Sequence, residues 1–125
     1  MEQFILKDET YQVIGICMEV HRILGHDFSE IVYKDAISIE AASKQIEVST
    51  EKEFTVYYKD ILLNHKFYAD FVMFGNIIVE IKACDKGISN DHIAQTINYL
   101  KISECSVGVI VNFGRKSLEY KGLVY

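Results

Sequence analysis

Apolar residues recur at helical spacing in three parts of the chain. The first set covers residues 13–24 and is followed by Gly25, a residue typical of helix ends. A second helix is predicted from Ser29, a residue common at helix N-termini, to about residue 44. A third is predicted to begin at Ser89 or Asn90, after a polar loop.

Runs rich in β-branched, aromatic and other apolar residues predict strands around the third helix. They lie at residues 46–48, 53–58, 61–64, 65–73, 106–111 and 118–125. The order of helix, helix, several strands, helix, strand and strand is typical of an α/β fold with a sheet flanked by helices.

The stretch ADFVMFGNIIVEIKA at residues 69–83 holds two apolar runs, separated by Phe-Gly-Asn at residues 74–76. Gly-Asn is a turn signal, and a hairpin would bring Asp70 on the first run near Glu80 on the second. Lys82 would share the face of Glu80, because residues two apart on a strand point the same way.

A carboxylate in such an apolar run is costly to bury unless a cation, a proton or hydrogen-bond donors compensate. Two converging carboxylates and a lysine therefore predict a divalent-metal site with a basic group beside it. The alternative is a half-buried ion pair between Glu80 and Lys82, with Asp70 satisfied by backbone amides. Crowding of carboxylates also predicts a raised pKa for Glu80.

Composition narrows the class of protein. The chain has 125 residues, half of them hydrophobic, and we expect a single domain over residues 1–125. Its net charge of −5 argues against a general nucleic-acid-binding protein, but an acidic metal site would supply part of that charge in a nuclease.

No apolar run is long enough to span a bilayer and the N-terminus is unlike a signal peptide, so we expect a cytoplasmic protein. The three cysteines form no C-x-x-C pair, which argues against a structural zinc or iron–sulfur site.

The predicted hairpin resembles the metal-binding signature of the PD-(D/E)XK nuclease-like superfamily. Ala69-Asp70 stands where that signature has Pro-Asp, and Glu80-Ile81-Lys82 stands where it has (D/E)-x-K. The resemblance implies a restriction-endonuclease-like core, in which helices flank a mixed central sheet, and here an extra N-terminal helix precedes it.

Three further segments resemble parts of the same superfamily. Residues 24–33, LGHDFSEIVY, are similar to the motif of the small GxxExxY proteins, a bacterial and archaeal branch, although Asp27 replaces the name-giving glycine. Residues 95–99, QTINY, resemble the Q-xxx-Y motif of the exonuclease branch. Residues 111–114, VNFG, resemble a closing segment of the small GxxExxY proteins.

The resemblance implies a Mg²⁺- or Mn²⁺-dependent nuclease. Asp70 and Glu80 would supply hard oxygen ligands, with the backbone carbonyl of Ile81 as a third. Glu30 would complete the cluster or hold a water beside it, although an acid in the first turn of a helix also favours the helix dipole without any site role.

The same resemblance assigns the remaining site residues. Lys82 would orient or help deprotonate the attacking water and offset charge in the transition state. Gln95 and Tyr99 would position the lysine or the nucleic-acid backbone, and Tyr33, on the helix of Glu30, is expected at the substrate.

Three functions remain open from the sequence. The first is hydrolysis of DNA or RNA without a covalent intermediate. The second is a binding or regulatory module that keeps the nuclease-like fold but does not cut. The third is a structural homodimer that uses the strand carrying Tyr57 and Tyr58.

Overall fold

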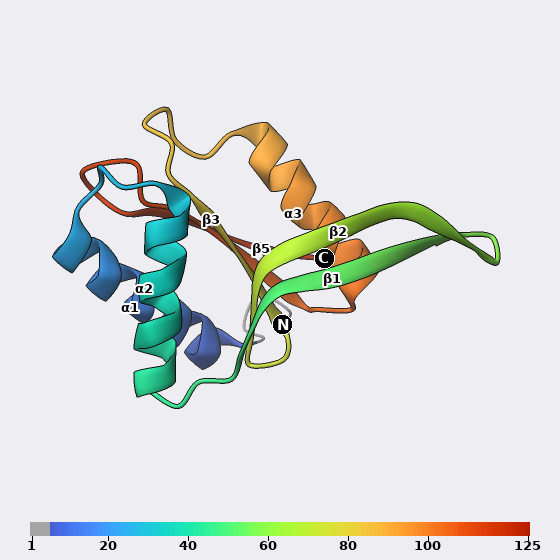
Figure 1. The fold of residues 1–125 in the computed structure, drawn as a ribbon, viewed down its shortest axis with the longest axis horizontal. Helices are drawn as coiled ribbons and strands as arrows, with labels where there is room; N and C mark the ends of the chain where they lie inside the picture. Colours follow the sequence, from blue (N-terminus) through green and yellow to red (C-terminus); the bar gives the residue numbers. More distant parts are fainter. Residues whose placement is uncertain (1–5) are drawn as a thin grey trace.

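The computed structural model describes residues 6–125 (Figure 1). In this part of the chain the elements are α1 (Lys7–Leu24), α2 (Glu30–Ser43), β1 (Val48–Tyr58), β2 (Ile61–Met73), β3 (Ile77–Lys82), α3 (Asn90–Ser103), β4 (Val107–Asn112) and β5 (Glu119–Val124). The predicted order of elements is confirmed. None of these helices is long and apolar enough to cross a membrane.

The five strands form one mixed sheet in the order β1-β2-β3-β4-β5. Neighbouring strands are antiparallel except β3 and β4, which run parallel. The parallel pair is possible because α3 connects the end of β3 to the start of β4. This crossover helix brings the chain back to the end of the sheet where β3 begins, so that β4 can run in the same direction. The predicted α/β fold with a mixed central sheet is therefore confirmed.

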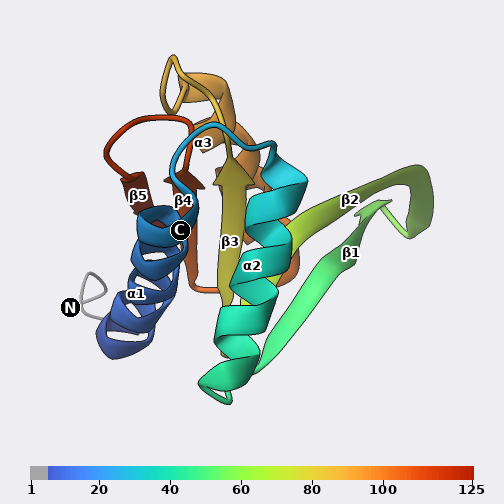
Figure 2. The ribbon, with the colours of Figure 1, turned by 60° about the vertical axis from the view of Figure 1, so that its left-hand side comes forward.

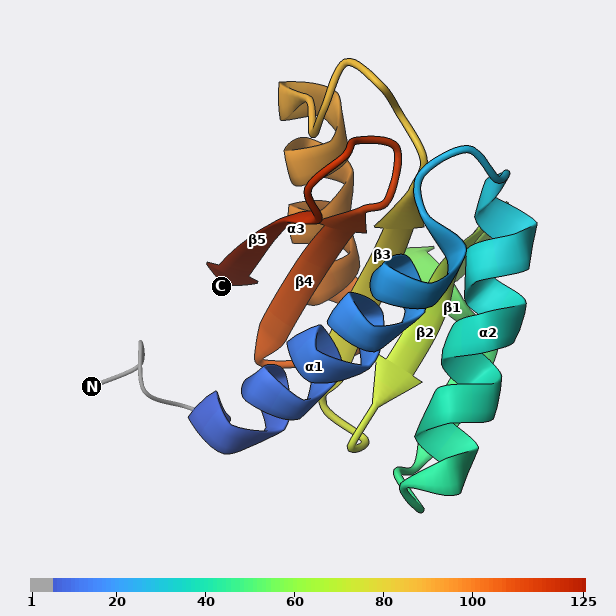
Figure 3. The ribbon, with the colours of Figure 1, turned by 90° about the vertical axis from the view of Figure 1, so that its left-hand side faces the viewer.

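Helices cover both faces of the centre of the sheet. Figures 2 and 3 show α1 and α2 on one face and α3 on the other. Every residue of β3 and β4 is buried except Lys82, which is half-buried. Strands covered on both faces need apolar side chains in both directions, which explains their nearly unbroken apolar sequences.

Two apolar clusters fill the space between the layers. The larger one joins α1 and α2 to the sheet, and its members include Val13, Ile16, Val20, Tyr33, Ile37, Phe71, Met73, Val79, Ile81, Val109 and Phe113. The smaller one lies under α3 and contains Ala69, Val72, Ile78, Tyr99, Leu100 and Cys105.

The hairpin of β1 and β2 extends beyond this core. The two strands pair from Val48–Met73 to Tyr58–Ile61, whereas β2 pairs with β3 at only three positions. The far half of the hairpin therefore has no third strand beside it and projects as an arm (Figures 1 and 2). The sequence predicted shorter separate strands here, because the polar residues of β1 resemble loops; they are tolerated on an exposed edge strand.

The predicted helix ends are confirmed. Gly25 ends α1 with a φ of 77°, a conformation that glycine adopts without steric cost. Ser29 is the N-cap residue of α2. Ser89 caps α3 in a capping box, in which its hydroxyl accepts from the His92 amide and the His92 ring accepts from the Ser89 amide.

Candidate functional site

The predicted acid pair lies where β2 separates from β3. Regular pairing of the two strands ends at Phe71–Val79. Beyond that point, the Ile81 amide donates to Asp70 Oδ2 at 2.8 Å, and the Asp70 amide donates to Glu80 Oε2 at 2.7 Å. Each carboxylate thus binds a backbone amide of the opposite strand. These bonds hold both side chains in the space between β2 and β3 beyond Phe71 and Val79, called the gap below.

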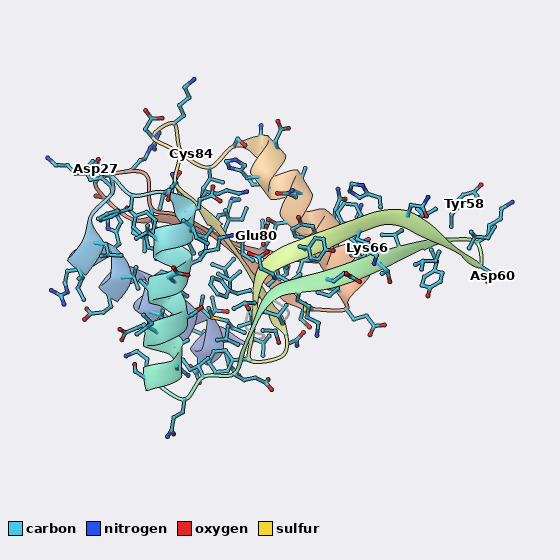
Figure 4. The ribbon with its side chains drawn as sticks, in the orientation of Figure 1. Asp27, Tyr58, Asp60, Lys66, Glu80 and Cys84 are labelled. Atoms are coloured by element: carbon cyan, nitrogen blue, oxygen red, sulfur yellow. The ribbon has the colours of Figure 1, made fainter. Side chains whose placement is uncertain are left out.

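The hairpin explains why these two residues meet. The turn at Phe74 and Gly75 sets the register of β2 against β3, and Asp70 and Glu80 come opposite each other when this register is continued. Figure 4 shows Glu80 beside the place where the hairpin of β1 and β2 leaves the sheet. The structure therefore brings together the two carboxylates that the sequence singled out.

Lys34 of α2 is a site residue that the sequence reasoning missed. Its ammonium lies 3.0 Å from Asp70 Oδ1 and 3.2 Å from Glu51 Oε1. The side chains of Lys34 and Asp70 are only 18% and 14% exposed, so this ion pair is much less screened than a surface pair. The sequence did contain an indication of this role, because Lys34 follows Glu30 by four residues and so lies on the same face of the helix.

The alternative ion pair between Glu80 and Lys82 does not form in the described residues 6–125. Asp70 does accept a backbone amide, from Ile81, as that alternative supposed, but its other oxygen pairs with Lys34 at 3.0 Å. Lys82 is half-buried at the end of β3, and its carbonyl accepts from the Phe113 amide at 2.8 Å. Its positive charge still acts on Glu80, because it lowers the pKa of that carboxyl.

The Glu80 carboxyl is strongly perturbed. Burial is the main cause that raises the pKa of Glu80 to about 8; the nearby charge of Asp70 also raises it, whereas the Asp70 amide, Lys82 and Lys34 lower it. The predicted rise of this pKa is confirmed. Burial disfavours the charged form of Lys34 and so lowers its pKa. The hydrogen bonds and negative charges of Asp70 and Glu51 outweigh this effect, and the pKa of Lys34 is raised. At neutral pH Glu80 is therefore mostly protonated, while the Lys34 ammonium lies 3.0 Å from Asp70 Oδ1.

Tyr99 of α3 lies beside the acid pair from the other face of the sheet. Burial raises its pKa to about 12, and the charges of Glu80 and Asp70 add to this shift. The side chain is 5% exposed, and its ring packs edge-on against Phe67 at 6.0 Å. Gln95, one turn earlier on α3, is exposed. A group on each face of the sheet thus reaches the same gap between β2 and β3.

The structure places Glu30 and Tyr33 differently from each other. Glu30 is half-buried at the first position of α2, but no group of three or more His, Cys, Asp or Glu side chains suited to a metal ion occurs among residues 6–125. Tyr33 is fully buried, and its hydroxyl donates to the Gly25 carbonyl at 2.7 Å. The Tyr33 side chain has no exposed surface in this structure, so its packing is accounted for, and its contact with a substrate stays a prediction.

The residues at the gap fit a hard divalent cation. Asp70 Oδ1 already faces an ammonium group, which shows that this position stabilises positive charge. Within the described chain, Glu80 Oε1 accepts no hydrogen bond and is free to serve as a ligand. The Ile81 amide points toward β2, and a paired strand residue directs its N–H and C=O to the same neighbour, so its carbonyl faces the gap as well. Mg²⁺ commonly binds few protein oxygens and keeps several waters.

A mixed sheet flanked by helices on both faces, with two carboxylates converging where a hairpin leaves the sheet, defines a nuclease-like α/β protein. The model of the PD-(D/E)XK nuclease superfamily matches residues 7–122, and the chain belongs to this superfamily. Nucleases of this superfamily generally use divalent metal ions.

A solved structure supports the fold. The chain is similar to the crystal structure of SSO0001, with a TM-score of 0.56 and 21% sequence identity over 75% of this chain and 48% of that one. The chain thus spans about half the length of that protein, and at this identity the likeness concerns the fold alone. No protein with a curated description matches the sequence.

Proposed function

We propose that this protein is a single-domain Mg²⁺- or Mn²⁺-dependent phosphodiesterase of the GxxExxY branch that hydrolyses nucleic-acid strands. The observation that carries the proposal is the convergence of Asp70 and Glu80 in the gap between β2 and β3, with the Lys34 ammonium on Asp70. A buried carboxyl with a strongly raised pKa beside specific charged partners is the kind of cluster that marks a candidate functional site.

Asp70, Glu80 and the Ile81 carbonyl would hold the cation. When bound, the ion would polarise the scissile phosphate and lower the pKa of a water. The hydrogen bonds from the backbone amides of Ile81 and Asp70 fix one oxygen of each carboxylate and leave the other oxygen for the ion. Glu30 would act from the start of α2 through a water, since it does not join the pair in a three-ligand group.

The remaining residues would act on the substrate and on charge. Lys82 at the end of β3 would orient the attacking water and offset charge on the phosphate in the transition state. The Tyr99 hydroxyl would hold the pair from the α3 side, and the exposed Gln95 would contact the strand. Lys34 would leave Asp70 Oδ1 when the cation arrives and remain paired with Glu51.

A binding or regulatory module without cleavage is the second candidate. The charge balance of the gap favours it, because Lys34 neutralises Asp70 and the raised pKa keeps Glu80 mostly protonated at neutral pH. A site that is already neutral attracts a divalent cation less strongly than a free carboxylate pair does.

Homodimerisation is a further possibility that we propose to test beside the two functions. Tyr57 and Tyr58 on the projecting arm are each 62% exposed. Sedimentation velocity would show whether the wild-type protein dimerises and whether serine substitutions at both tyrosines abolish it.

Cleavage and metal binding together decide between the functions. Linear, circular and single-stranded DNA and RNA are incubated with the protein in Mg²⁺ and in Mn²⁺, beside Asp70→Asn and Lys82→Ala proteins. For a phosphodiesterase, Asp70→Asn loses cleavage and also the thermal stabilisation by Mg²⁺. Lys82→Ala keeps that stabilisation but loses about 10²–10³ in rate, as expected for one electrostatic group. Metal stabilisation without cleavage of any substrate would favour the regulatory module instead.

A further inference from the structure

An open groove of about 920 Å³ lies at the end of β3 that follows the acid pair in the chain. It starts at Ala83 and Cys84, directly after Lys82, and lies between three loops that follow β3, α1 and β4. Figure 4 shows Cys84 and Asp27 at this end of the molecule, far from the hairpin tip at Tyr58 and Asp60. The groove does not include the acid pair, and the proposed hydrolysis gives it no role.

The wall formed by the loops after β3 and β4 is held by the buried side chain of Asn112. Its Oδ1 accepts from the Cys84 amide at 2.9 Å and the Gly114 amide at 3.1 Å, and its Nδ2 donates to the Cys84 carbonyl at 2.8 Å. The two loops approach so closely that a Cβ on Gly114 would overlap the backbone of Cys84. These contacts explain why asparagine ends β4 and why glycine stands two residues later.

The opposite wall is held by Tyr33. Its hydroxyl donates to the Gly25 carbonyl at 2.7 Å and accepts from the Phe28 amide at 3.2 Å. Its ring stacks on Phe113 at 4.5 Å, which ties this wall to the loop after β4. The segments 24–33 and 111–114, which lie outside the acid pair, thus build the two walls of the groove.

The lining of the groove carries one net positive charge, although the chain as a whole carries a net charge of −5. Its lining includes Lys86, Arg115 and Lys116 against two acids, Asp27 and Asp85. None of the three cations forms a salt bridge with the described residues 6–125. Arg115 is held in place because its side chain donates to the Asp85 carbonyl at 3.1 Å.

We propose that this groove binds the phosphates of a single nucleic-acid strand next to the scissile bond. The proposal rests on the proposed function, because it assumes that the acid pair cuts such a strand. Lys86 and Lys116 would contact phosphates, and Phe28, which is 47% exposed on the groove wall, would stack on an unpaired base. Stacking on one exposed ring requires a base that is free of its partner, which favours a single strand over a duplex.

The test measures binding without metal, so that cleavage does not enter. Fluorescence anisotropy is recorded in EDTA at several salt concentrations, with labelled single strands of DNA and RNA of about 12 nucleotides, a length typical for such sites. Lys86→Gln/Lys116→Gln is compared with Lys59→Gln/Lys121→Gln, which removes two exposed charges outside the groove.

We expect the groove variant to bind about tenfold more weakly at low salt and to lose about 1.4 from the slope of log K against log salt, at 0.7 for each phosphate contact. The control variant should match the wild type. Phe28→Ala should weaken single-strand binding about fivefold or more and leave duplex binding unchanged.

Equal losses in the groove variant and the control variant would overturn the proposal, and so would wild-type binding by the groove variant. Absent binding by the wild-type protein would overturn it as well. Cleavage by the wild-type protein in Mg²⁺ would then show that the phosphodiesterase stands without the groove. Binding that depends on the groove without any cleavage would instead refute the phosphodiesterase.

Discussion

Substitution of Lys34 by methionine tests whether its ammonium occupies the position of the proposed metal ion. Methionine preserves the length of the side chain and removes the charge that lies 3.0 Å from Asp70 Oδ1. An Mg²⁺ ion held by the same oxygen would lie roughly 4 Å from the ammonium, where a divalent and a single positive charge repel by about 8 kcal/mol at an effective dielectric constant near 20. Lys34 can relax toward Glu51, so we expect a net gain of about 1–2 kcal/mol in Mg²⁺ binding, or five- to thirtyfold.

The pH of this experiment matters because Lys34 also acts on Glu80. Its charge lowers the pKa of Glu80, so the substitution raises that pKa further and favours the protonated carboxyl. The titration of Mg²⁺ by calorimetry is therefore performed well above the Glu80 pKa of about 8, at the same pH for both proteins, so that protonation of Glu80 does not mask the effect of Lys34. The variant should also unfold more easily by about 1–3 kcal/mol, because Asp70 loses its cationic partner.

Lys44→Met is the matched control. Lys44 lies at the other end of α2, about 15 Å from Lys34, and pairs with Glu40 at 3.3 Å. It removes the same charge from the same helix and should leave Mg²⁺ affinity unchanged. If a folded Lys34→Met protein binds Mg²⁺ no more tightly than the wild type, Lys34 does not compete with the ion and the reasoning fails.

The remaining predictions concern stability. Because the pKa of Glu80 rises from 4.5 to about 8 on folding, the folded protein holds a proton that the unfolded chain releases. The stabilisation that this proton gives the folded state is complete below pH 4.5 and disappears as the pH rises through 8. The free energy of unfolding measured in urea should therefore fall by a few kcal/mol between these pH values, and the Glu80→Gln protein should lack this decrease. Gly114→Ala should lower stability by about 1–3 kcal/mol because its Cβ would overlap Cys84, whereas Gly122→Ala, with free space around it, should not. Tyr33→Phe should cost about 1–2 kcal/mol for its two hydrogen bonds and leave calorimetric Mg²⁺ affinity intact, while reduced Mg²⁺ affinity would show that Tyr33 supports the site directly.

Elements with local signals were predictable from the sequence. The apolar period of each helix, Gly25 after α1 and Ser89 before α3 are properties of neighbouring residues, and the structure confirms the elements they predict. Gly75 of the predicted Gly-Asn turn likewise lies in the turn that sets the register of β2 and β3, where Phe74 and Gly75 are the central residues, so the approach of Asp70 and Glu80 followed from a few residues.

Features that depend on distant packing were not predictable. The pairing of Lys34 with Asp70 joins residues 36 positions apart, and it depends on how α2 packs across the sheet. The strand pattern also gave no sign that β1 and β2 form one long arm, because an edge strand tolerates polar residues that look like a loop. Tyr33 shared a face with a predicted site residue, yet the tight packing against Phe113 buries it completely.

Polar residues that the fold buries in otherwise apolar strands are informative about function, because such positions are costly and are expected at functional sites. Glu80 lies in the buried strand β3, and its position costs free energy that a regular β2–β3 pairing with an apolar residue would avoid. Asn112 lies in the buried strand β4, where its side chain fixes the loop after β3. The two residues sit near the C-terminal ends of adjacent parallel strands, with the acid pair at one and the groove at the other. If the groove binds the substrate strand as proposed, the ends of the same two strands position both the binding groove and the acid pair.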